Sequence, residues 1–148
     1  MRIRGYLGLF LAVLAACAPA AAADYVRLRN RWVSQAYLNV EPGYVQVSTI
    51  QSGWFSAQWT IIPAPNGFVR LKNRWKGCYL HIERGEVECT NDVRDGWLSA
   101  QWMASNAGNG YVFLQNRWKS CYLNVQRGPV ECTSIKKGWH SAQWAAEN

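Results

Sequence analysis

The sequence predicts an all-β domain made of three similar units that close on one another with pseudo-threefold symmetry. Each unit is about 42 residues long, and its opening asparagine returns every 43 residues, at Asn30, Asn73 and Asn116. All nine tryptophans lie inside the three copies. A repeat of this length is one supersecondary unit that cannot bury its apolar face alone, so the three units must share a core.

Each unit contains the same three short motifs in the same order. In the first unit they are Arg29-Asn30-Arg31-Trp32, Tyr37-Leu38-Asn39-Val40 and Gly53-Trp54-Phe55-Ser56-Ala57-Gln58-Trp59. In the second they are Lys72-Asn73-Arg74-Trp75, Tyr79-Leu80-His81-Ile82 and Gly96-Trp97-Leu98-Ser99-Ala100-Gln101-Trp102. In the third they are Gln115-Asn116-Arg117-Trp118, Tyr122-Leu123-Asn124-Val125 and Gly138-Trp139-His140-Ser141-Ala142-Gln143-Trp144.

Four short strands are expected in each unit, and therefore twelve in all. Runs rich in Val, Tyr, Trp and Ile with period-two alternation are interrupted by Gly, Pro and Asn, which is the pattern of short strands and turns. In the first unit the expected strands cover about 25–30, 37–40, 44–47 and 57–62. Alternation directs Leu38 and Trp59 into the core, and it directs Asn39 to the solvent side.

Residues 1–23 differ from the rest and are interpreted as an export signal, with a basic start, an apolar run and a stretch of alanines. The apolar run is too short to span a bilayer as a permanent helix. The segment that ends at Cys17 looks like the bacterial lipobox, in which cleavage leaves a lipid-bearing cysteine; ordinary cleavage just before Asp24 is the alternative. The folded domain is expected to cover residues 24–148. The protein is thus expected to be periplasmic, an outer-membrane lipoprotein or secreted.

Apart from Cys17, the chain has four cysteines, spaced as Cys-x10-Cys in the second and third units. Four cysteines permit three pairings, but identical spacing in two copies of an exported chain favours closure within each copy. The expected disulfides are Cys78–Cys89 and Cys121–Cys132. The first unit has Ala36 and Val47 at these positions, so both partners are missing together.

The formal net charge is +7, and removing the two arginines of residues 1–23 leaves +5. This moderate charge favours contact with anionic surfaces or glycans. It falls short of the dense basic stripe that duplex nucleic acid requires, so no nucleic-acid partner is expected. Basic residues alternate with other residues from Arg70 to Lys76, and their charges can share one exposed strand face that would suit an acidic glycan.

Twelve strands in three copies, with a Tyr-Leu-x-Val segment late in the first hairpin (Ile82 replaces the Val in the second copy) and a closing Trp, resemble the β-trefoil. The export signal, the in-repeat cysteines and the units that end in Trp are similar, more narrowly, to ricin-B-type lectin domains over residues 24–148. Residues 121–125 followed by Gly128 are similar to that family's segment of a cysteine, an apolar residue, a sugar-binding Asp and a glycine. The chain departs from the family in two ways. The family's Gln-x-Trp is Gln-Trp here, and Asn39, His81 and Asn124 stand near where the family places Asp.

Each unit also supplies side chains of the kind that bind sugars, which need a flat aromatic ring against the C–H face and polar groups for the hydroxyls. A tryptophan after a glycine, an outward glutamine and a polar residue of the second strand would form one pocket per unit. The candidates are Asn39, Trp54 and Gln58; His81, Trp97 and Gln101; and Asn124, Trp139 and Gln143. Alternatively, these tryptophans cap the barrel and the glutamines bond loop backbone.

The segment Asn30-Arg31-Trp32 and its copies form a second constellation, because Arg beside Trp can stack on or fork onto an anion such as sulfate, phosphate or carboxylate. The favoured interpretation is structural. The Asn forms a turn, the Trp covers the core, and the Arg stem lies over it.

No sequence feature indicates catalysis. Neither His-Glu-x-x-His nor Gly-x-Ser-x-Gly occurs, and His81 and His140 have no partner at metal-ligand spacing. The sequence therefore predicts a non-enzymatic carbohydrate-binding protein with up to three weak sites for glycans, including acidic ones, and without cofactor or metal. The alternative is a protein-binding trefoil, such as a protease inhibitor or the cell-binding subunit of a toxin complex. Membrane attachment is expected only through a lipid at Cys17.

Overall fold

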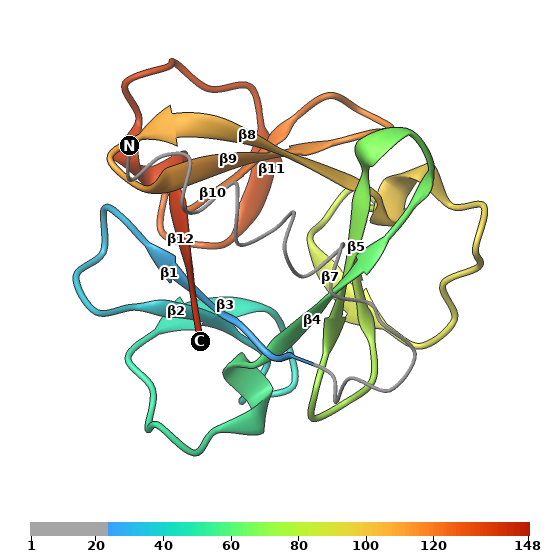
Figure 1. The fold of residues 1–148 in the computed structure, drawn as a ribbon, viewed down its shortest axis with the longest axis horizontal. Helices are drawn as coiled ribbons and strands as arrows, with labels where there is room; N and C mark the ends of the chain where they lie inside the picture. Colours follow the sequence, from blue (N-terminus) through green and yellow to red (C-terminus); the bar gives the residue numbers. More distant parts are fainter. Residues whose placement is uncertain (1–23) are drawn as a thin grey trace.

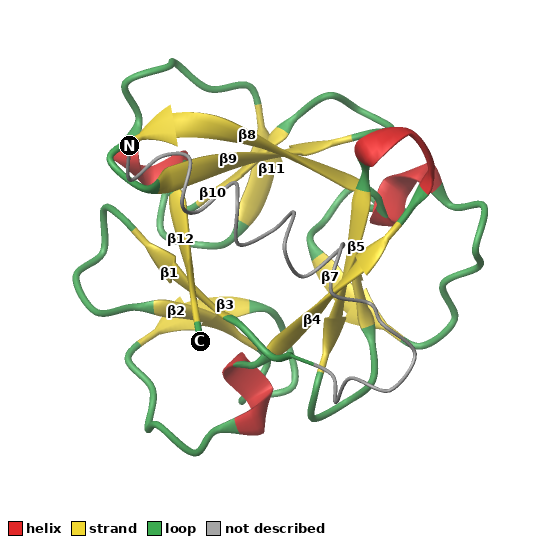
Figure 2. Cartoon of the chain, in the orientation of Figure 1, coloured by secondary structure: helices red, strands yellow, loops and turns green. Residues whose placement is uncertain are grey.

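The computed structural model describes residues 24–148, which form twelve strands and four short 3-10 helices (Figure 2). The strands are β1 (Arg27–Asn30), β2 (Tyr37–Asn39), β3 (Gln46–Ser48), β4 (Trp59–Pro63), β5 (Val69–Asn73), β6 (Tyr79–His81), β7 (Glu88–Thr90), β8 (Trp102–Gly108), β9 (Tyr111–Asn116), β10 (Tyr122–Asn124), β11 (Glu131–Thr133) and β12 (Trp144–Glu147). The helices are η1 (Phe55–Ala57), η2 (Pro65–Gly67), η3 (Leu98–Ala100) and η4 (His140–Ala142). The predicted all-β class and twelve strands are confirmed. The export signal and the lipidation site expected at Cys17 lie outside the described residues.

Six of the strands form a closed barrel. Antiparallel pairs join β1 to β12, β12 to β9, β9 to β8, β8 to β5 and β5 to β4. An isolated bridge between Val26 and Trp59 closes the ring, and the equivalent positions of the other two units pair in the same way. Each unit therefore contributes its first and fourth strands to the barrel (Figure 1).

The second and third strands of each unit form a hairpin outside the barrel: β2 with β3, β6 with β7, and β10 with β11. Each hairpin turns at a glycine with a positive φ, which is 98° at Gly43, 95° at Gly85 and 102° at Gly128. A left-handed φ is accessible to glycine without steric cost, so the repeated glycine fixes the same turn in all three units. Figure 1 shows the three units arranged around a common centre.

The core is filled by one closing tryptophan and a set of aliphatic side chains from each unit. Trp59, Trp102 and Trp144 have no exposed surface. Each indole Nε1 donates a hydrogen bond of 3.0 Å to the carbonyl oxygen of the second strand's leucine. Burial removes these large rings from water while the bond satisfies their one polar atom, as a buried Trp requires. Leu38 and Trp59, the side chains that alternation directs into the core, are buried, whereas Val47 is only partly buried.

The opening asparagine of each unit joins it to the preceding one. Asn73 is buried, and its Nδ2 donates to the carbonyl oxygen of Ser56 at 2.8 Å. Its Oδ1 accepts the backbone amide hydrogens of Trp75 and Lys76, which forms the turn between β5 and β6. The same bonds recur at Asn30 and Asn116. The turn-forming role expected for this asparagine is confirmed.

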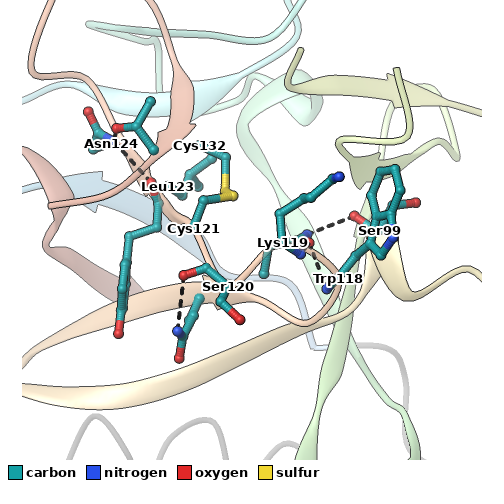
Figure 3. Close-up of a disulfide and its surroundings, with 12 residues drawn as sticks. Ser99, Trp118, Lys119, Ser120, Cys121, Leu123, Asn124 and Cys132 are labelled. Carbon is teal, nitrogen blue, oxygen red and sulfur yellow. Dashed lines mark hydrogen bonds between the residues drawn. A yellow bond between two sulfur atoms is a disulfide. The ribbon is translucent and has the colours of Figure 1, made fainter. Parts of the chain in front are cut away.

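The two disulfides close within units 2 and 3, as the spacing predicts. Cys78 bonds to Cys89 and Cys121 bonds to Cys132, with Cα atoms 5.2 Å apart in both pairs. Figure 3 shows the second of these bridges. Each bridge crosses the hairpin from the start of its first strand to its second strand. Stable disulfides form in oxidising compartments, so the bridges indicate such an environment for the domain. None of the helices within residues 24–148 is long and apolar enough to cross a membrane.

Candidate functional site

The polar residue of each second strand is buried, which corrects the expected solvent-side position. Asn39, His81 and Asn124 have at most 1% of their surface exposed. In unit 3, Asn124 Oδ1 accepts the backbone amide hydrogen of Gln126, while its Nδ2 donates to the carbonyl oxygen of Tyr122 and to Thr133 Oγ1. The side chain is therefore held under the hairpin because it satisfies the backbone of the turn. Strand alternation alone did not reveal that the hairpin folds over this face.

The glutamine before each core tryptophan is also withdrawn from solvent. Gln101 and Gln143 are only 3% exposed, and Gln58 is half-buried. The reason is the arginine of the following unit, which donates from Nη1 to the glutamine Oε1: Arg74 to Gln58 at 2.7 Å, Arg117 to Gln101 at 2.8 Å and Arg31 to Gln143 at 2.7 Å. The outward position expected for the glutamines is therefore wrong for Gln101 and Gln143, whereas Gln58 keeps part of its surface exposed. All three glutamines bond to the neighbouring unit.

These arginines also stack on aromatic rings of the preceding unit. The guanidinium of Arg74 lies 3.7 Å from the centroid of Phe55 and 4.1 Å from that of Tyr25. Arg117 lies over Phe68, and Arg31 lies over Tyr111. The arginine thus has a structural role, but not the expected one, because it lies over rings of the preceding unit and not over the tryptophan beside it. That tryptophan is not a core lid either. Trp32, Trp75 and Trp118 are 51%, 46% and 43% exposed.

The glycine-preceded tryptophans Trp54, Trp97 and Trp139 are neither sealed in the core nor fully exposed. Each directly precedes a 3-10 helix in the loop between the third and fourth strands. The helix breaks the strand, so the parity argument that linked these rings to the glutamines does not apply. Their half-burial leaves part of each indole available to a ligand.

In unit 3, the structure brings Trp139 and Asn124 to one pocket of about 370 Å³. Its lining consists of Asn124, Gln126, Arg127, Glu131, Thr133, Ser134 and Trp139. Gln143 is not among them. The pocket therefore joins two of the three candidates predicted for this unit, together with side chains of β11 and of the hairpin turn.

Hydrogen-bonding capacity remains in the unit 3 pocket. Thr133 Oγ1 accepts the Asn124 amide hydrogen at 2.7 Å, but its hydroxyl hydrogen has no acceptor among residues 24–148. Asn124 Oδ1 accepts a single hydrogen bond and can take a second. Arg127 donates hydrogen bonds to both carboxylate oxygens of the half-buried Glu131, and the shortest, from Nη2 to Oε2, is 2.6 Å. A carboxylate held in this way can still accept further hydrogen bonds, because each oxygen has two lone pairs.

At the equivalent place in unit 2, the polar groups are bonded to one another. His81 Nδ1 accepts the amide hydrogen of Glu83, so the ring hydrogen lies on Nε2 and donates to Thr90 Oγ1 at 2.7 Å. The Thr90 hydroxyl in turn donates to Asp92 Oδ1, and Arg84 donates to Asp92 Oδ2 at 3.0 Å. The hydrogen bond from Thr90, together with the charge of Arg84, holds the pKa of Asp92 below its usual range.

In unit 1 the buried amide is internally satisfied. Asn39 Oδ1 accepts from the amide of Glu41 and from Gln46 Nε2, and its Nδ2 donates to the carbonyl oxygen of Tyr37 and to Ser48 Oγ. All four hydrogen-bonding positions of this amide are therefore occupied.

Sequence reasoning missed Gln126, Arg127, Glu131 and Thr133 as members of the unit 3 pocket. A usable signal was present, because Glu-Cys-Thr occurs at residues 88–90 and again at 131–133, and Ser48 stands at the same place in unit 1. The hydroxyl lies nine residues after the buried polar residue in every unit. Alternation places the two side chains on the same side of a paired hairpin.

No protein-family model matches the chain, and no curated protein matches its sequence. Solved structures do match it. The GlcNAcα1-4Gal-releasing endo-β-galactosidase from Clostridium perfringens matches with a TM-score of 0.74 and 27% identity, over 83% of this chain and 32% of that chain. This chain thus spans about a third of the enzyme's length. The designed threefold-symmetric protein ThreeFoil matches with a TM-score of 0.73 and 24% identity, over 84% of this chain and 98% of that one. The chain is a β-trefoil.

A third solved trefoil match is SeviL, whose structure was determined with an asialo-GM1 saccharide. It matches with a TM-score of 0.66 and 14% identity, over 84% of this chain and 97% of that chain. At this identity the likeness concerns the fold. The barrel and hairpins described above are therefore a shared scaffold, whereas the pocket beside Trp139 has to be argued from its own side chains.

The surface has two further hollows. A cavity of about 650 Å³ lies where the three hairpin turns meet, with Tyr44, Glu86 and Pro129 from the three units at equivalent positions of its wall. Tyr44 is 65% exposed. A smaller cleft of about 240 Å³ lies between units 2 and 3. Within residues 24–148, no group of three or more His, Cys, Asp or Glu side chains is placed to hold a metal ion.

Proposed function

We propose that this trefoil is an exported, non-catalytic carbohydrate-binding protein whose principal site is the unit 3 pocket beside Trp139. The observation that carries the proposal is the pocket itself. It combines a half-buried indole with a hydroxyl hydrogen, an amide oxygen and a carboxylate that can each take one more hydrogen bond. Sugar recognition needs this combination of an aromatic face and a few convergent polar groups.

Each lining residue has a defined part in the proposed site. The Trp139 ring packs against the C–H face of one pyranose. The Thr133 hydroxyl donates to a sugar oxygen, while Asn124 Oδ1 and Glu131 accept from sugar hydroxyls. Because Arg127 neutralises Glu131, the pocket has no net charge from its ionised groups, and neutral sugars are favoured over acidic ones.

The solved matches support the class of ligand without fixing its identity. One of them was determined with a bound saccharide, and another is an enzyme that acts on a galactose-containing glycan. The chain corresponds to only about a third of that enzyme. We therefore infer sugar binding for this chain and carry over no catalytic activity.

A glycan array with the mature protein is the direct test. We expect binding to a limited set of neutral glycans, and we expect Trp139→Ala to weaken it strongly. Trp54→Ala is the matched control, because Trp54 is the equivalent indole of unit 1, where the polar groups are internally satisfied. Silence across neutral and acidic glycans, or equal binding by wild type and Trp139→Ala, would contradict the proposal.

Protein binding is the second candidate function, and the cavity at the meeting of the three hairpin turns favours it. Its wall repeats a valine in every unit, at Val45, Val87 and Val130, while the residue before each valine differs. A wall with unlike residues suits one asymmetric partner better than a small repeated ligand. Tyr44→Ala distinguishes the two functions, since it should abolish protein binding and leave glycan binding unchanged.

The proposed localisation follows from the disulfides and the N-terminal sequence. We propose that the chain is exported and then either freely released or anchored through a lipid on Cys17. Mass spectrometry of the mature N-terminus tests the two routes. A diacylated or triacylated Cys17 supports anchoring, whereas an unmodified start at Asp24 supports release.

A further inference from the structure

The cleft between units 2 and 3 has the composition of a second ligand site. It is lined by Glu83, Gly96, Trp97, Leu98 and Ser99 of unit 2 and by Trp118 of unit 3. None of these residues lines the pocket beside Trp139. At about 240 Å³, the cleft is smaller than the roughly 300 to 1,000 Å³ of pockets for drug-sized ligands, so it fits a single ring rather than an extended chain.

Trp118 is not needed for the fold at this place. Asn116 holds the turn, because its Oδ1 accepts the amide hydrogens of Trp118 and Lys119 and its Nδ2 donates to the carbonyl oxygen of Ser99. Figure 3 shows Trp118 lying beside Ser99 at this junction. The indole itself is 43% exposed, and the equivalent Trp32 and Trp75 are exposed to a similar degree. A large apolar ring kept half in water in all three units gains little for folding.

Trp97 lines the same cleft, and a neighbouring ring packs against it. Its ring lies 5.6 Å from the ring of the fully buried His81, in an edge-on arrangement. Gly96 precedes it, and a Cβ atom built there would meet nothing within 4 Å. The indole is thus fixed by packing on one side and open on the other, which is the preorganised state that favours binding.

The polar end of the cleft is the Glu83 carboxylate, of which one oxygen accepts a hydrogen bond. The Ser99 hydroxyl donates to Glu83 Oε1 at 2.5 Å, and Oε2 has no partner among residues 24–148. The same bond recurs from Ser56 to Glu41 and from Ser141 to Gln126, both at 2.6 Å. A fixed oxygen acceptor beside two indoles suits a ring with one apolar face and hydroxyl groups at its edge. The Glu83 carboxylate and the Lys119 ammonium, which lies 4.2 Å from the centroid of the Trp118 ring, have opposite charges, so the cleft has no excess charge that would select an ionic ring.

We propose that the junction of units 2 and 3 is a second carbohydrate site, which takes one neutral pyranose between Trp97 and Trp118 and bonds its hydroxyls through Glu83. The inference rests on the proposed function only for the class of ligand. Its position, its residues and its partner ring on a neighbouring unit are independent of the Trp139 pocket. The protein would then bind glycans at two unlike sites.

The test is a saccharide titration of the 15N-labelled mature protein, followed through its nine indole N–H signals. The probes are galactose, glucose, N-acetylglucosamine and lactose. We expect the Trp97 and Trp118 signals to move with one of these sugars. In Trp118→Ala the Trp97 response should weaken about tenfold or more, which is the loss of one aromatic contact. Trp75→Ala, at the equivalent exposed position of the junction between units 1 and 2, is the matched control and should leave the Trp97 response unchanged.

The outcomes separate this inference from the proposed function. If the Trp139 signal alone responds, or if Trp118→Ala leaves the Trp97 response intact, the junction site is refuted and the principal site stands. If Trp97 and Trp118 respond and Trp139 does not, the principal site is wrong and the junction site stands. If no indole moves with any probe, both fail. Unchanged signals of the three buried indoles show that each variant is folded.

Discussion

Units 2 and 3 have nearly the same hairpin and the same disulfide, yet they differ at the place where a ligand would bind. In unit 3, Arg127 is paired with Glu131 and the Thr133 hydroxyl hydrogen remains available. In unit 2, Arg84 is shared between Glu88 and Asp92, and Thr90 donates to Asp92. The Asp92 carboxylate thus accepts the threonine hydroxyl hydrogen that unit 3 leaves for a ligand, and it also binds Arg84, whose counterpart Arg127 pairs with Glu131.

The source of this difference is one inserted residue. Seven positions separate Thr90 from Trp97, whereas six separate Thr133 from Trp139. The loop of unit 2 therefore has room for Asn91 and Asp92 where unit 3 has Ser134 alone. A repeated scaffold can hence carry unequal sites without any change in its barrel, because the variation is confined to a loop.

The largest effect is expected from removing the disulfide of unit 3 and giving its hairpin the residues of unit 1, as in Cys121→Ala with Cys132→Val. Closing a loop of 11 residues stabilises the fold by about 3 kcal/mol in the chain-entropy model, so unfolding in urea should show a loss of that size. Glycan binding should fall as well, because Glu131 and Thr133 flank Cys132 on β11.

The matched control is Cys78→Ala with Cys89→Val in unit 2, which removes a disulfide that closes a loop of the same length. It should cost similar stability and leave glycan binding at the Trp139 pocket unchanged. If both pairs of substitutions reduced binding equally, the comparison between the units would be wrong, since binding would then depend on overall stability rather than on one hairpin.

The next effect concerns the inserted loop. Deletion of Asn91 combined with Asp92→Ser gives unit 2 the loop length of unit 3. Arg84 should then pair with Glu88, and the Thr90 hydroxyl should be released for a ligand. We expect a new binding event at unit 2, or an affinity there raised up to about tenfold, the worth of one hydrogen bond. Isothermal titration calorimetry measures it as a change in stoichiometry, and an unaltered stoichiometry would show that Asp92 does not block the site.

A smaller effect is expected from Thr133→Val, which keeps the shape of the side chain and removes its hydroxyl. The ligand loses one donor and Asn124 Nδ2 loses one acceptor, so affinity for the glycan should fall roughly threefold to tenfold. Thr90→Val is the control in unit 2 and should leave glycan affinity unaltered. The reverse result would place the ligand in unit 2.

The fold could be predicted because three copies of one pattern reinforce each other. Trp59, Leu38 and their equivalents share parity, spacing and chemistry, so a wrong assignment in one copy would have contradicted the other two. The disulfides followed from the same logic, since Ala36 and Val47 replace both partners together in unit 1. Repetition turns weak local signals into a consistent architecture.

The site could be predicted only in part, because the positions of its polar side chains depend on contacts that strand alternation cannot reveal. Gln143 was expected to face a ligand, but Arg31 of the next unit in the ring covers it. Asn124 was expected in solvent, but the turn after β10 takes up its hydrogen bonds. Trp139 was placed correctly beside Asn124, but the strand alternation used to place it does not apply, because a 3-10 helix interrupts the strand after Trp139. Such bonds across a unit boundary or a hairpin are set by tertiary packing.

The smallest effect is a pH dependence of the unfolding free energy that arises only in unit 2, because His81 stands there in place of the asparagine of units 1 and 3. Burial lowers the pKa of His81 below its usual value near 6.5, because the ring is removed from water. The unfolded chain therefore takes up a proton before the folded protein does, and stability is full above about pH 6.5 and falls as the pH drops toward the lowered pKa. Protonation of Nδ1 would also break its bond to the Glu83 amide.

In urea unfolding, His81→Asn should lose this part of the pH dependence of the unfolding free energy, whose limiting slope for one proton is about 1.4 kcal/mol per pH unit. Unfolding free energies of wild type and His81→Asn that follow parallel curves between pH 5 and pH 7.5 would contradict this prediction. The His81 ring would then accept a proton as easily in the folded protein as in the unfolded chain, and the hydrogen bonds of His81, Thr90 and Asp92 would contribute nothing to keeping it neutral.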